Sequence, residues 1–270
     1  MSSIKKTYVG IKGFFKKKTP AQKVRNNTFL QQIFGKRFFL NPNFLNVKFT
    51  AYLPDSVFIF KAHPEFKDLF KKFTFKNKIN NGGDTARLLS IILNIKQVMA
   101  EGIKGEFAEL GVWRGNTAAI LAHYANKHQR KVYLFDTFEG FNNADFVGID
   151  AKQHISFNNT SIDLVKKNIG TDDVVCSYIK GFFPKSITEE HENLTYAIVS
   201  LDCDLYAPTK AGLLFFYDRM PKGGIFFLHD YSSLFWEGSK LAIDEFCTEK
   251  NEYVILMPDK SGSAFLRKSK

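Results

Sequence analysis

Acidic side chains and one histidine follow two of the apolar runs in this sequence. Asp202 and Asp204 come directly after one run, and His229 and Asp230 come directly after another. If both runs are parallel strands, their carboxyl ends meet at one edge of a sheet, so we expect the four side chains to lie together. Crowded carboxylates raise one another's pKa unless they share a cation or a proton, which predicts a divalent metal site or a general base. The alternative is that one or two of them cap helices or face solvent.

Two glycines, four positions apart, lie at the end of an earlier apolar run. Gly111 and Gly115 allow a tight turn with close backbone approach to a ligand, but their spacing lacks the third glycine of the dinucleotide fingerprint, which argues against an NAD enzyme. Asp136 ends the next run, roughly 20 residues further on, where a carboxylate can accept both hydroxyl hydrogens of a ribose. The two features together indicate a nucleoside-containing cofactor. The alternative for Asp136 alone is a helix cap.

Strand-length and helix-length segments alternate along the part of the chain that carries these residues. Strands are expected at Glu106–Val112, Val132–Phe135, Val174–Ile179, Ala197–Leu201 and Ile225–Leu228. Helices are expected at Thr85–Met99, Thr117–His128, Ser161–Ile169 and Pro208–Arg219. This alternation is typical of an α/β fold with a mostly parallel central sheet and helices on both faces.

The basic charge lies at one end of the chain. Of 270 residues, those before Asp55 include no acid and 11 Lys or Arg, which account for the whole formal net charge of +11. Asn80, Asn81, Gly82 and Gly83 form a turn signal, and Asp84 can cap the following helix. We therefore expect a basic, Phe-rich N-terminal arm or cap at residues 1–80 and the main domain at residues 81–270. Such an arm suits an anionic membrane surface, or it packs on its own domain or a dimer mate.

The cysteines and the hydropathy pattern bear on location. The three cysteines lack CxxC spacing, so neither a disulfide framework nor a structural zinc site is indicated, and a reducing cytosol fits. The N-terminus lacks the apolar core and cleavage site of a signal peptide, and no run reaches the ~18 apolar residues of a membrane span. We expect a soluble, cytoplasmic protein, with peripheral contact at the inner face of the membrane as a further option.

Five segments in order resemble the macrocin O-methyltransferase family, over roughly Asn80 to Lys250. They are Gly105–Thr117 (GEFAELGVWRGNT), Tyr133–Phe141 (YLFDTFEGF), Gly181–Pro184 (GFFP), Leu201–Thr209 (LDCDLYAPT) and Gly223–Tyr231 (GGIFFLHDY). The resemblance implies a class I methyltransferase, Rossmann-like fold. It also implies an S-adenosylmethionine-dependent enzyme that methylates hydroxyls, notably those of sugars, often with magnesium.

The resemblance also assigns roles to residues. The residues that it implies for S-adenosylmethionine binding are Glu109, Gly111, Gly115, Thr117, Asp136, Thr137, Phe138 and Gly181. It implies Asp204 as the general base and Asp202 and Asp230 as metal ligands. His229, which stands where the family commonly has an acid, is the third predicted metal ligand. Imidazole favours softer transition ions over magnesium, so the predicted metal is Mg²⁺, Mn²⁺ or another divalent ion.

The leading functional hypothesis is an O-methyltransferase for a sugar hydroxyl of a glycan precursor or a glycosylated small molecule. Alternatives are a nucleic-acid methyltransferase or binder that uses the basic arm, a catechol-like small-molecule O-methyltransferase, and a non-catalytic interaction module. Nucleic acid is the less favoured partner because the chain beyond the arm is formally neutral. A homo-oligomer is compatible with the sequence, and loop 142–159 is expected to influence acceptor specificity.

Overall fold

The computed structural model describes residues 63–141 and 143–270. The chain divides into two compact units, Met1–Ala51 and Tyr52–Lys270, and every described residue belongs to the second. The basic segment before Asp55 lies outside the described residues, and the domain boundary expected near residue 80 stays a prediction. No helix of the described part is long and apolar enough to cross a membrane.

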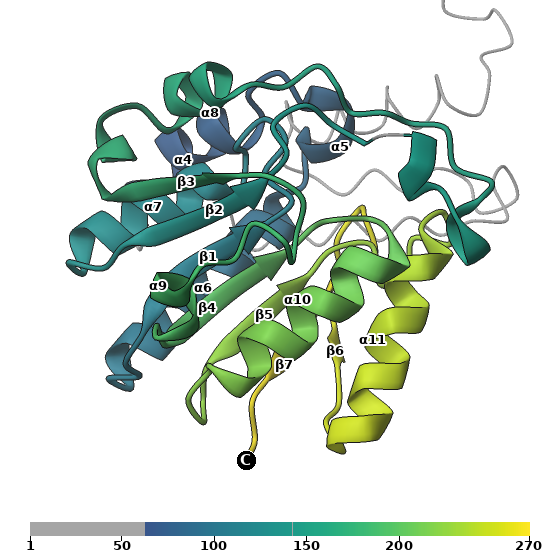
Figure 1. The fold of residues 1–270 in the computed structure, drawn as a ribbon. Coiled ribbons are helices and arrows are strands. Elements are labelled where there is room, and N and C mark those ends of the chain that lie inside the picture. The colour runs from purple at the N-terminus through teal and green to yellow at the C-terminus, as the bar shows by residue number, and fades with distance from the viewer. Residues whose placement is uncertain (1–62, 142) are drawn as a thin grey trace, which may run out of the picture. The chain divides into compact units, whose positions relative to one another are not determined.

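The second unit is built around one mixed sheet. Its strands are β1 (Glu106–Leu110), β2 (Val132–Asp136), β3 (Cys176–Lys180), β4 (Tyr196–Leu201), β5 (Ile225–Leu228), β6 (Ile255–Leu256) and β7 (Ala264–Arg267). They lie in the order β3-β2-β1-β4-β5-β7-β6. The first five of these are parallel, whereas β7 runs antiparallel to β5 and β6. The predicted α/β class and mostly parallel sheet are confirmed (Figure 1).

Helices connect and cover the strands. They are α4 (Phe66–Phe73), α5 (Lys78–Asn81), α6 (Thr85–Ala100), α7 (Ala118–Lys127), α8 (Ile162–Ile169), α9 (Glu189–Glu192), α10 (Tyr206–Asp218) and α11 (Glu237–Lys250). Short 3-10 turns occupy η2 (Asn143–Asp145), η3 (Gly148–Asp150) and η4 (Gly170–Val175). The four helices expected from the sequence correspond to α6, α7, α8 and α10 within two residues at each end.

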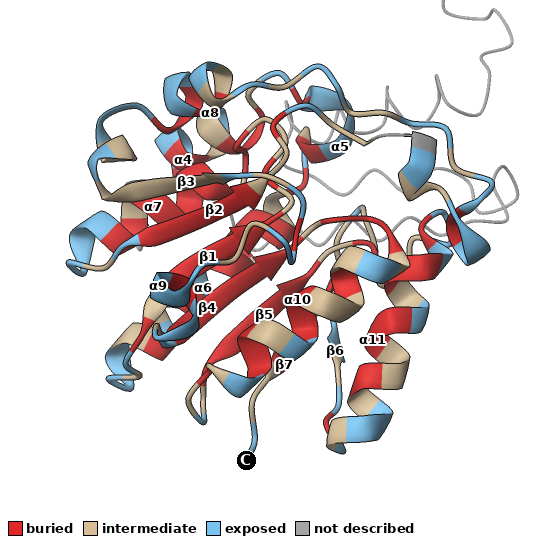
Figure 2. Ribbon diagram, viewed as in Figure 1, coloured by how far each residue is buried: buried red, intermediate tan, exposed pale blue. Residues whose placement is uncertain are grey.

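The core has two layers because alternate strand residues point to opposite faces. In β2, Val132 and Leu134 pack in the cluster that includes α4, α6 and α7, whereas Tyr133 and Phe135 pack in the cluster that includes α10 and α11. In Figure 2 the strands β1, β2, β4 and β5 are coloured almost wholly as buried. Burial on both faces explains why these strands appear in the sequence as continuous apolar runs.

The chain reverses its direction of travel across the sheet between β1 and β4. From β1 the chain proceeds to β2 and β3 on one side, and it then returns to add β4 and β5 on the other side. The connections that leave β1 and β4 lead to opposite halves of the sheet, and ligands in such sheets bind in the crevice at the carboxyl edge where this reversal occurs. This crevice is the place where the sequence puts the candidate site residues.

Candidate functional site

A cavity of ≈ 570 Å³ lies at the carboxyl edge of the parallel strands. Ten of the twelve predicted site residues line it: Glu109, Gly111, Thr117, Asp136, Thr137, Gly181, Asp202, Asp204, His229 and Asp230. The other two, Gly115 and Phe138, are close in sequence to the lining but do not themselves line the cavity. Segments that follow five different strands thus converge on one cavity, as the strand-end argument predicts.

Gly111 brings the loop after β1 against the loop after β4. Its φ is +85°, in the left-handed region that favours glycine. A Cβ at this position would lie 2.0 Å from the carbonyl oxygen of Asp202. Because Gly111 has no side chain, the turn after β1 can lie directly against the backbone of Asp202 after β4.

Asp136 holds the same turn from the neighbouring strand. Its Oδ2 accepts hydrogen bonds from the backbone N–H groups of Val112 at 2.6 Å and Trp113 at 2.9 Å. Its Oδ1 accepts another from the backbone N–H of Phe138 at 2.6 Å. A carboxylate has about four acceptor positions, so at least one stays available for a ligand hydroxyl. The side chain thus shapes the turn and lines the cavity at once.

Glu109 is a buried acid with one unpaired oxygen. The residue is 2% exposed, and Oε1 accepts a long hydrogen bond of 3.4 Å from the Ser200 hydroxyl. Oε2 is buried and has no hydrogen-bond partner among the described residues. Burial first, and then the charges of Asp202 and Asp136, raise the pKa of Glu109 well above its ordinary value. A buried acceptor without a partner is costly, so this oxygen fits a ligand that donates a hydrogen bond or brings positive charge.

Asp202, Asp204, His229 and Asp230 gather into what we call the acidic cluster. One ligand atom from each of the four lies within 4.8 Å of all the others. Asp204 and Asp230 have φ values of +59° and +58°, a conformation that residues with side chains rarely adopt. Such backbone conformations concentrate at functional sites because only the surrounding structure can enforce them. The sequence prediction that these four residues lie together is confirmed.

The acids of this cluster differ in their electrostatic surroundings. Burial first, followed by the charges of Asp202 and Asp230, raises the pKa of Asp204 well above its ordinary value. Burial also acts to raise the pKa of Asp202, but the adjacent His229 outweighs it, and the pKa of Asp202 is lowered. Asp202 is therefore the ionised partner of His229, whereas Asp204 is a carboxyl with a high proton affinity.

Sequence reasoning missed Arg87, which joins this cluster from α6. The residue is 5% exposed and lines the cavity, and its Nη1 contacts Nε2 of His229. Its Nη2 donates to Oδ1 of Asn81, and its guanidinium lies over the ring of Phe73 at 4.9 Å. Arg87 and His229 are 142 positions apart, so no local pattern could have paired them.

Aromatic side chains form another part of the wall that the sequence did not predict. Phe157 is at their centre, with ring centroids 5.3 Å from Trp113, 5.8 Å from Phe141 and 6.1 Å from Trp236. All four rings line the cavity. Phe157 and Phe141 bracket much of the 142–159 segment, so the part of this segment that the structure describes does reach the site, as expected of a specificity loop.

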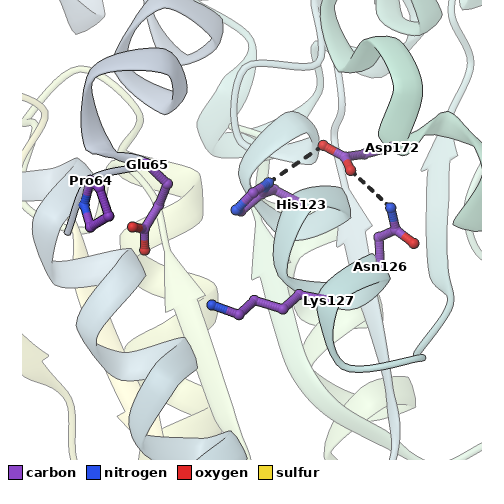
Figure 3. A pocket seen from close by; sticks show the side chains of 6 residues that line it. All are labelled: Pro64, Glu65, His123, Asn126, Lys127 and Asp172. Atoms are coloured by element: carbon purple, nitrogen blue, oxygen red, sulfur yellow. Dashed lines mark hydrogen bonds and ion pairs between the residues drawn. The ribbon is translucent and has the colours of Figure 1, made fainter.

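A second hollow of ≈ 380 Å³ lies away from the acidic cluster. It is lined by Pro64, Glu65, His123, Asn126, Lys127 and Asp172. Figure 3 shows two of its polar groups paired with Asp172, which accepts a hydrogen bond from Asn126 at 3.0 Å and lies 3.6 Å from Nδ1 of His123. None of the predicted site residues belongs to this hollow.

The donor set of the acidic cluster fits a divalent metal only in part. The carboxylates of Asp202, Asp204 and Asp230 supply oxygens of the kind that magnesium and manganese prefer. Nδ1 of His229 lies 2.8 Å from Oδ1 of Asp202 and 2.5 Å from Oδ2 of Asp230, and Nε2 faces Arg87. Both ring nitrogens are thus engaged by the protein, so His229 does not fit the role of a metal ligand in this arrangement.

Two curated O-methyltransferases are similar in sequence to this chain. A tetracenomycin-C rhamnosyl 4'-O-methyltransferase from Streptomyces olivaceus is 27% identical over 158 residues, which is 54% of this chain and 60% of that protein. The mycinamicin III 3''-O-methyltransferase of Micromonospora griseorubida is 29% identical over 153 residues, or 51% of this chain and 59% of that protein. The chain thus spans about 60% of the length of these curated relatives.

Solved structures show the same fold. The O-methyltransferase NovP has a TM-score of 0.60 at 21% identity, over 68% of this chain and 80% of its own. The calicheamicin methyltransferase CalS11 has a TM-score of 0.54 at 21% identity, over 80% of this chain and 95% of its own. The expected class I methyltransferase fold is confirmed. Because the profile of the family described as Macrocin-O-methyltransferase (TylF) matches residues 83–265, more than half of the sequence, the chain belongs to that family.

Proposed function

We propose that this protein is an S-adenosylmethionine-dependent O-methyltransferase that methylates a sugar hydroxyl of a glycan precursor or a glycosylated small molecule. The observation that carries the proposal is that a buried acid with raised pKa, Asp204, shares one cavity with the glycine turn after β1 and with Asp136. Family membership supports methyl transfer, and the curated relatives named above are O-methyltransferases of a rhamnosyl tetracenomycin C and of mycinamicin III. A base and a nucleoside site side by side are what this reaction requires.

The residues at the β1 and β2 ends fit the donor. The unpaired Oε2 of Glu109 suits the ammonium group of the methionine end, and Asp136 retains acceptor capacity for a ribose hydroxyl. Gly111 and Gly115 give the turn its shape, and Thr117, Thr137 and Gly181 complete the wall, with Phe138 donating its N–H to Asp136 behind it. S-adenosylmethionine supplies a methyl group on a sulfonium, a good leaving group that departs as a neutral thioether.

Asp204 acts as the general base in this proposal. The acceptor oxygen forms a bond to the methyl carbon while the carbon–sulfur bond breaks, sulfur keeps that electron pair, and the hydroxyl proton passes to a carboxylate oxygen of Asp204. A raised pKa makes Asp204 a stronger proton acceptor than an exposed aspartate, which helps because a sugar hydroxyl is a weak acid. Holding donor and acceptor in line supplies the remainder of the rate enhancement.

Binding of the methyl donor and product tests the first half of the proposal. Calorimetric titration with S-adenosylmethionine and S-adenosylhomocysteine should show one site per chain, and it requires no knowledge of the acceptor. The proposal would be contradicted if neither compound binds. Nucleotide sugars and glycosides can then be screened for transfer of a labelled methyl group.

Asp204→Asn tests the second half. The amide keeps the shape of the carboxyl but cannot take a proton, so turnover should fall by about 100-fold or more while affinity for S-adenosylhomocysteine stays within about twofold. Asp218→Asn is the matched control, because Asp218 is an exposed acid that pairs with Lys250. Full activity of Asp204→Asn would refute the role of this base.

The remaining expectations stay predictions. The proposed contacts of the arm (residues 1–80) with an anionic membrane or with nucleic acid depend on its basic residues before Asp55, which lie outside the described residues. The cytoplasmic location, a homo-oligomer and a catechol-like acceptor are likewise untested. The predicted divalent metal at Asp202, His229 and Asp230 is not part of the reaction proposed above, since His229 does not fit it as a ligand.

A further inference from the structure

A buried guanidinium stands beside the acidic cluster. Arg87 is held in place from several directions: Nη2 donates to Asn81, Nη1 donates to the hydroxyl of Ser261 at 3.3 Å, and the planar group rests on the ring of Phe73. Its own helix contributes Asp84, whose Oδ2 lies 3.8 Å from Nε. A guanidinium keeps its charge at any physiological pH. The cavity therefore contains a permanent, positioned cation.

Arg87 and the carboxylates together occupy both nitrogens of His229. Nδ1 lies between Asp202 and Asp230, at 2.8 Å and 2.5 Å, and these oxygens can only be acceptors when ionised, so Nδ1 carries a proton. If the ring is neutral, the lone pair on Nε2 faces Nη1 of Arg87; if the ring is a cation, it has no lone pair at all. In either charge state the ring offers no electron pair to a metal ion.

The same arrangement competes with a divalent ion for the carboxylates. An ion bridging Asp202 and Asp230 would have to displace the Nδ1–H of His229 from both of them. It would also stand close to the positive charge of Arg87, which contacts the far side of the same ring. Two of the acids are thereby already paired, whereas Asp204 forms no ion pair with any described residue.

We propose that Arg87 and His229 replace the divalent cation at this cluster, so that the protein transfers methyl groups without a resident metal. Arg87 is then a positioning residue: it engages Nε2 and keeps the ring between Asp202 and Asp230. With those two acids paired to His229, Asp204 is the acid of the cluster that forms no ion pair with a described residue; it shares a hydrogen bond with Asp230. The inference rests on the proposed function, because the cluster is the one assigned to methyl transfer, but metal binding can be measured independently of activity.

The experiment is a titration of the chelator-dialysed full chain with Mn²⁺, with free ion followed by electron paramagnetic resonance. Wild type should show no stoichiometric binding up to about 1 mM, a range in which oxygen-ligand sites normally fill. His229→Asp removes the imidazole and adds a fourth carboxylate, so this variant should bind Mn²⁺ at least about tenfold more tightly. Asp218→Asn should match wild type.

A second variant addresses Arg87 itself. Arg87→Met removes the charge that faces Nε2, and it should also bind Mn²⁺ or Co²⁺ at least about tenfold more tightly than wild type, with cobalt absorption that reports an imidazole ligand. If Arg87 only supports the structure, Arg87→Met should not gain metal affinity. If loss of the buried guanidinium unfolds the chain, His229→Asp and wild type still decide the question.

Two results would overturn the proposal. One is a wild-type chain that binds a single Mn²⁺ with a dissociation constant below about 100 µM in competition with Mg²⁺. The other is methyl transfer that EDTA abolishes and Mg²⁺ restores. Failure of the proposed function gives a different pattern, in which S-adenosylhomocysteine does not bind whether or not a metal is present.

Discussion

Replacing Gly111 with alanine should destabilise the protein for two separable reasons. The residue has φ +85°, and a left-handed conformation costs a residue with a Cβ about 1–2 kcal/mol. The new Cβ would also lie 2.0 Å from the carbonyl oxygen of Asp202, which is backbone and cannot rotate away. Forcing apart packed segments by one carbon typically costs about 1–3 kcal/mol. The expected loss of unfolding free energy is therefore about 2–5 kcal/mol.

Gly102→Ala is the matched control. Gly102 follows the end of α6 with φ +71°, and its Cβ would meet nothing within 4 Å. This variant carries the cost of the conformation alone, about 1–2 kcal/mol. The difference between the two variants, about 1–3 kcal/mol, therefore measures the contact between the loops after β1 and β4.

Urea unfolding followed by far-ultraviolet circular dichroism gives both values, provided the slope of free energy against urea is the same for all three proteins. Calorimetry with S-adenosylhomocysteine adds a functional readout. Gly111→Ala should lose at least about tenfold in affinity because the turn can no longer approach the ligand, whereas Gly102→Ala should bind as wild type does. Equal destabilisation by the two substitutions would refute the close backbone contact at Gly111.

Two further variants probe ionised side chains outside the acidic cluster. Burial tends to raise the pKa of Glu65, but hydrogen bonds from Lys96 and Tyr124 outweigh it and lower the pKa from 4.5 to about 2. This stabilisation is therefore present above pH 4.5 and is lost as the pH falls towards 2. In urea unfolding, Glu65→Gln should lower the free energy of unfolding by about 2 kcal/mol at pH 7 and leave it unchanged near pH 2. A loss that does not depend on pH would contradict this. Asp136→Asn should cost about 2–3 kcal/mol, because one oxygen that accepts backbone N–H groups becomes a donor, and weaker binding of S-adenosylhomocysteine should accompany it. Unchanged stability of Asp136→Asn would show that the loop satisfies those N–H groups in another way.

Four of the five strands that the sequence predicted are buried on both faces, and the fifth, β3, is half-buried. Strands β1, β2, β4 and β5 are almost wholly buried, so their apolar runs are continuous and end sharply where the cavity begins. The two added strands give a weaker signal. Both residues of the two-residue strand β6 are exposed, and β7 alternates between buried and half-buried positions. Their place in the sheet depends on antiparallel pairing of β7 with β5 and of β6 with β7, which no local pattern encodes.

Helix α4 was not predicted, for a different reason. Phe66, Leu69 and Phe73 have helical spacing and are buried in the core cluster that also includes α6 and α7. In the sequence this short segment is surrounded by the lysines and phenylalanines of the N-terminal region, which obscure its period. The basic, Phe-rich composition of the surrounding region thus masks an eight-residue helix. Its apolar face is recognisable only once it is seen packed against the helices that it covers.

The candidate site also has a part that strand topology determines and a part that only side-chain packing determines. Parallel strands require their carboxyl ends to meet, so the convergence of Asp202, Asp204 and Asp230 could be argued from strand ends alone. Nothing in strand topology says which cation would neutralise them. The guanidinium that reaches His229 comes from the first turn of α6, a helix that precedes β1 in the chain. The sequence prediction of a metal therefore rested on the negative charges alone, and the guanidinium of Arg87 is the cation that the structure adds beside them. Where a fold gathers acids at a sheet edge, the helices that cover this edge must be searched for basic residues before a metal is assigned.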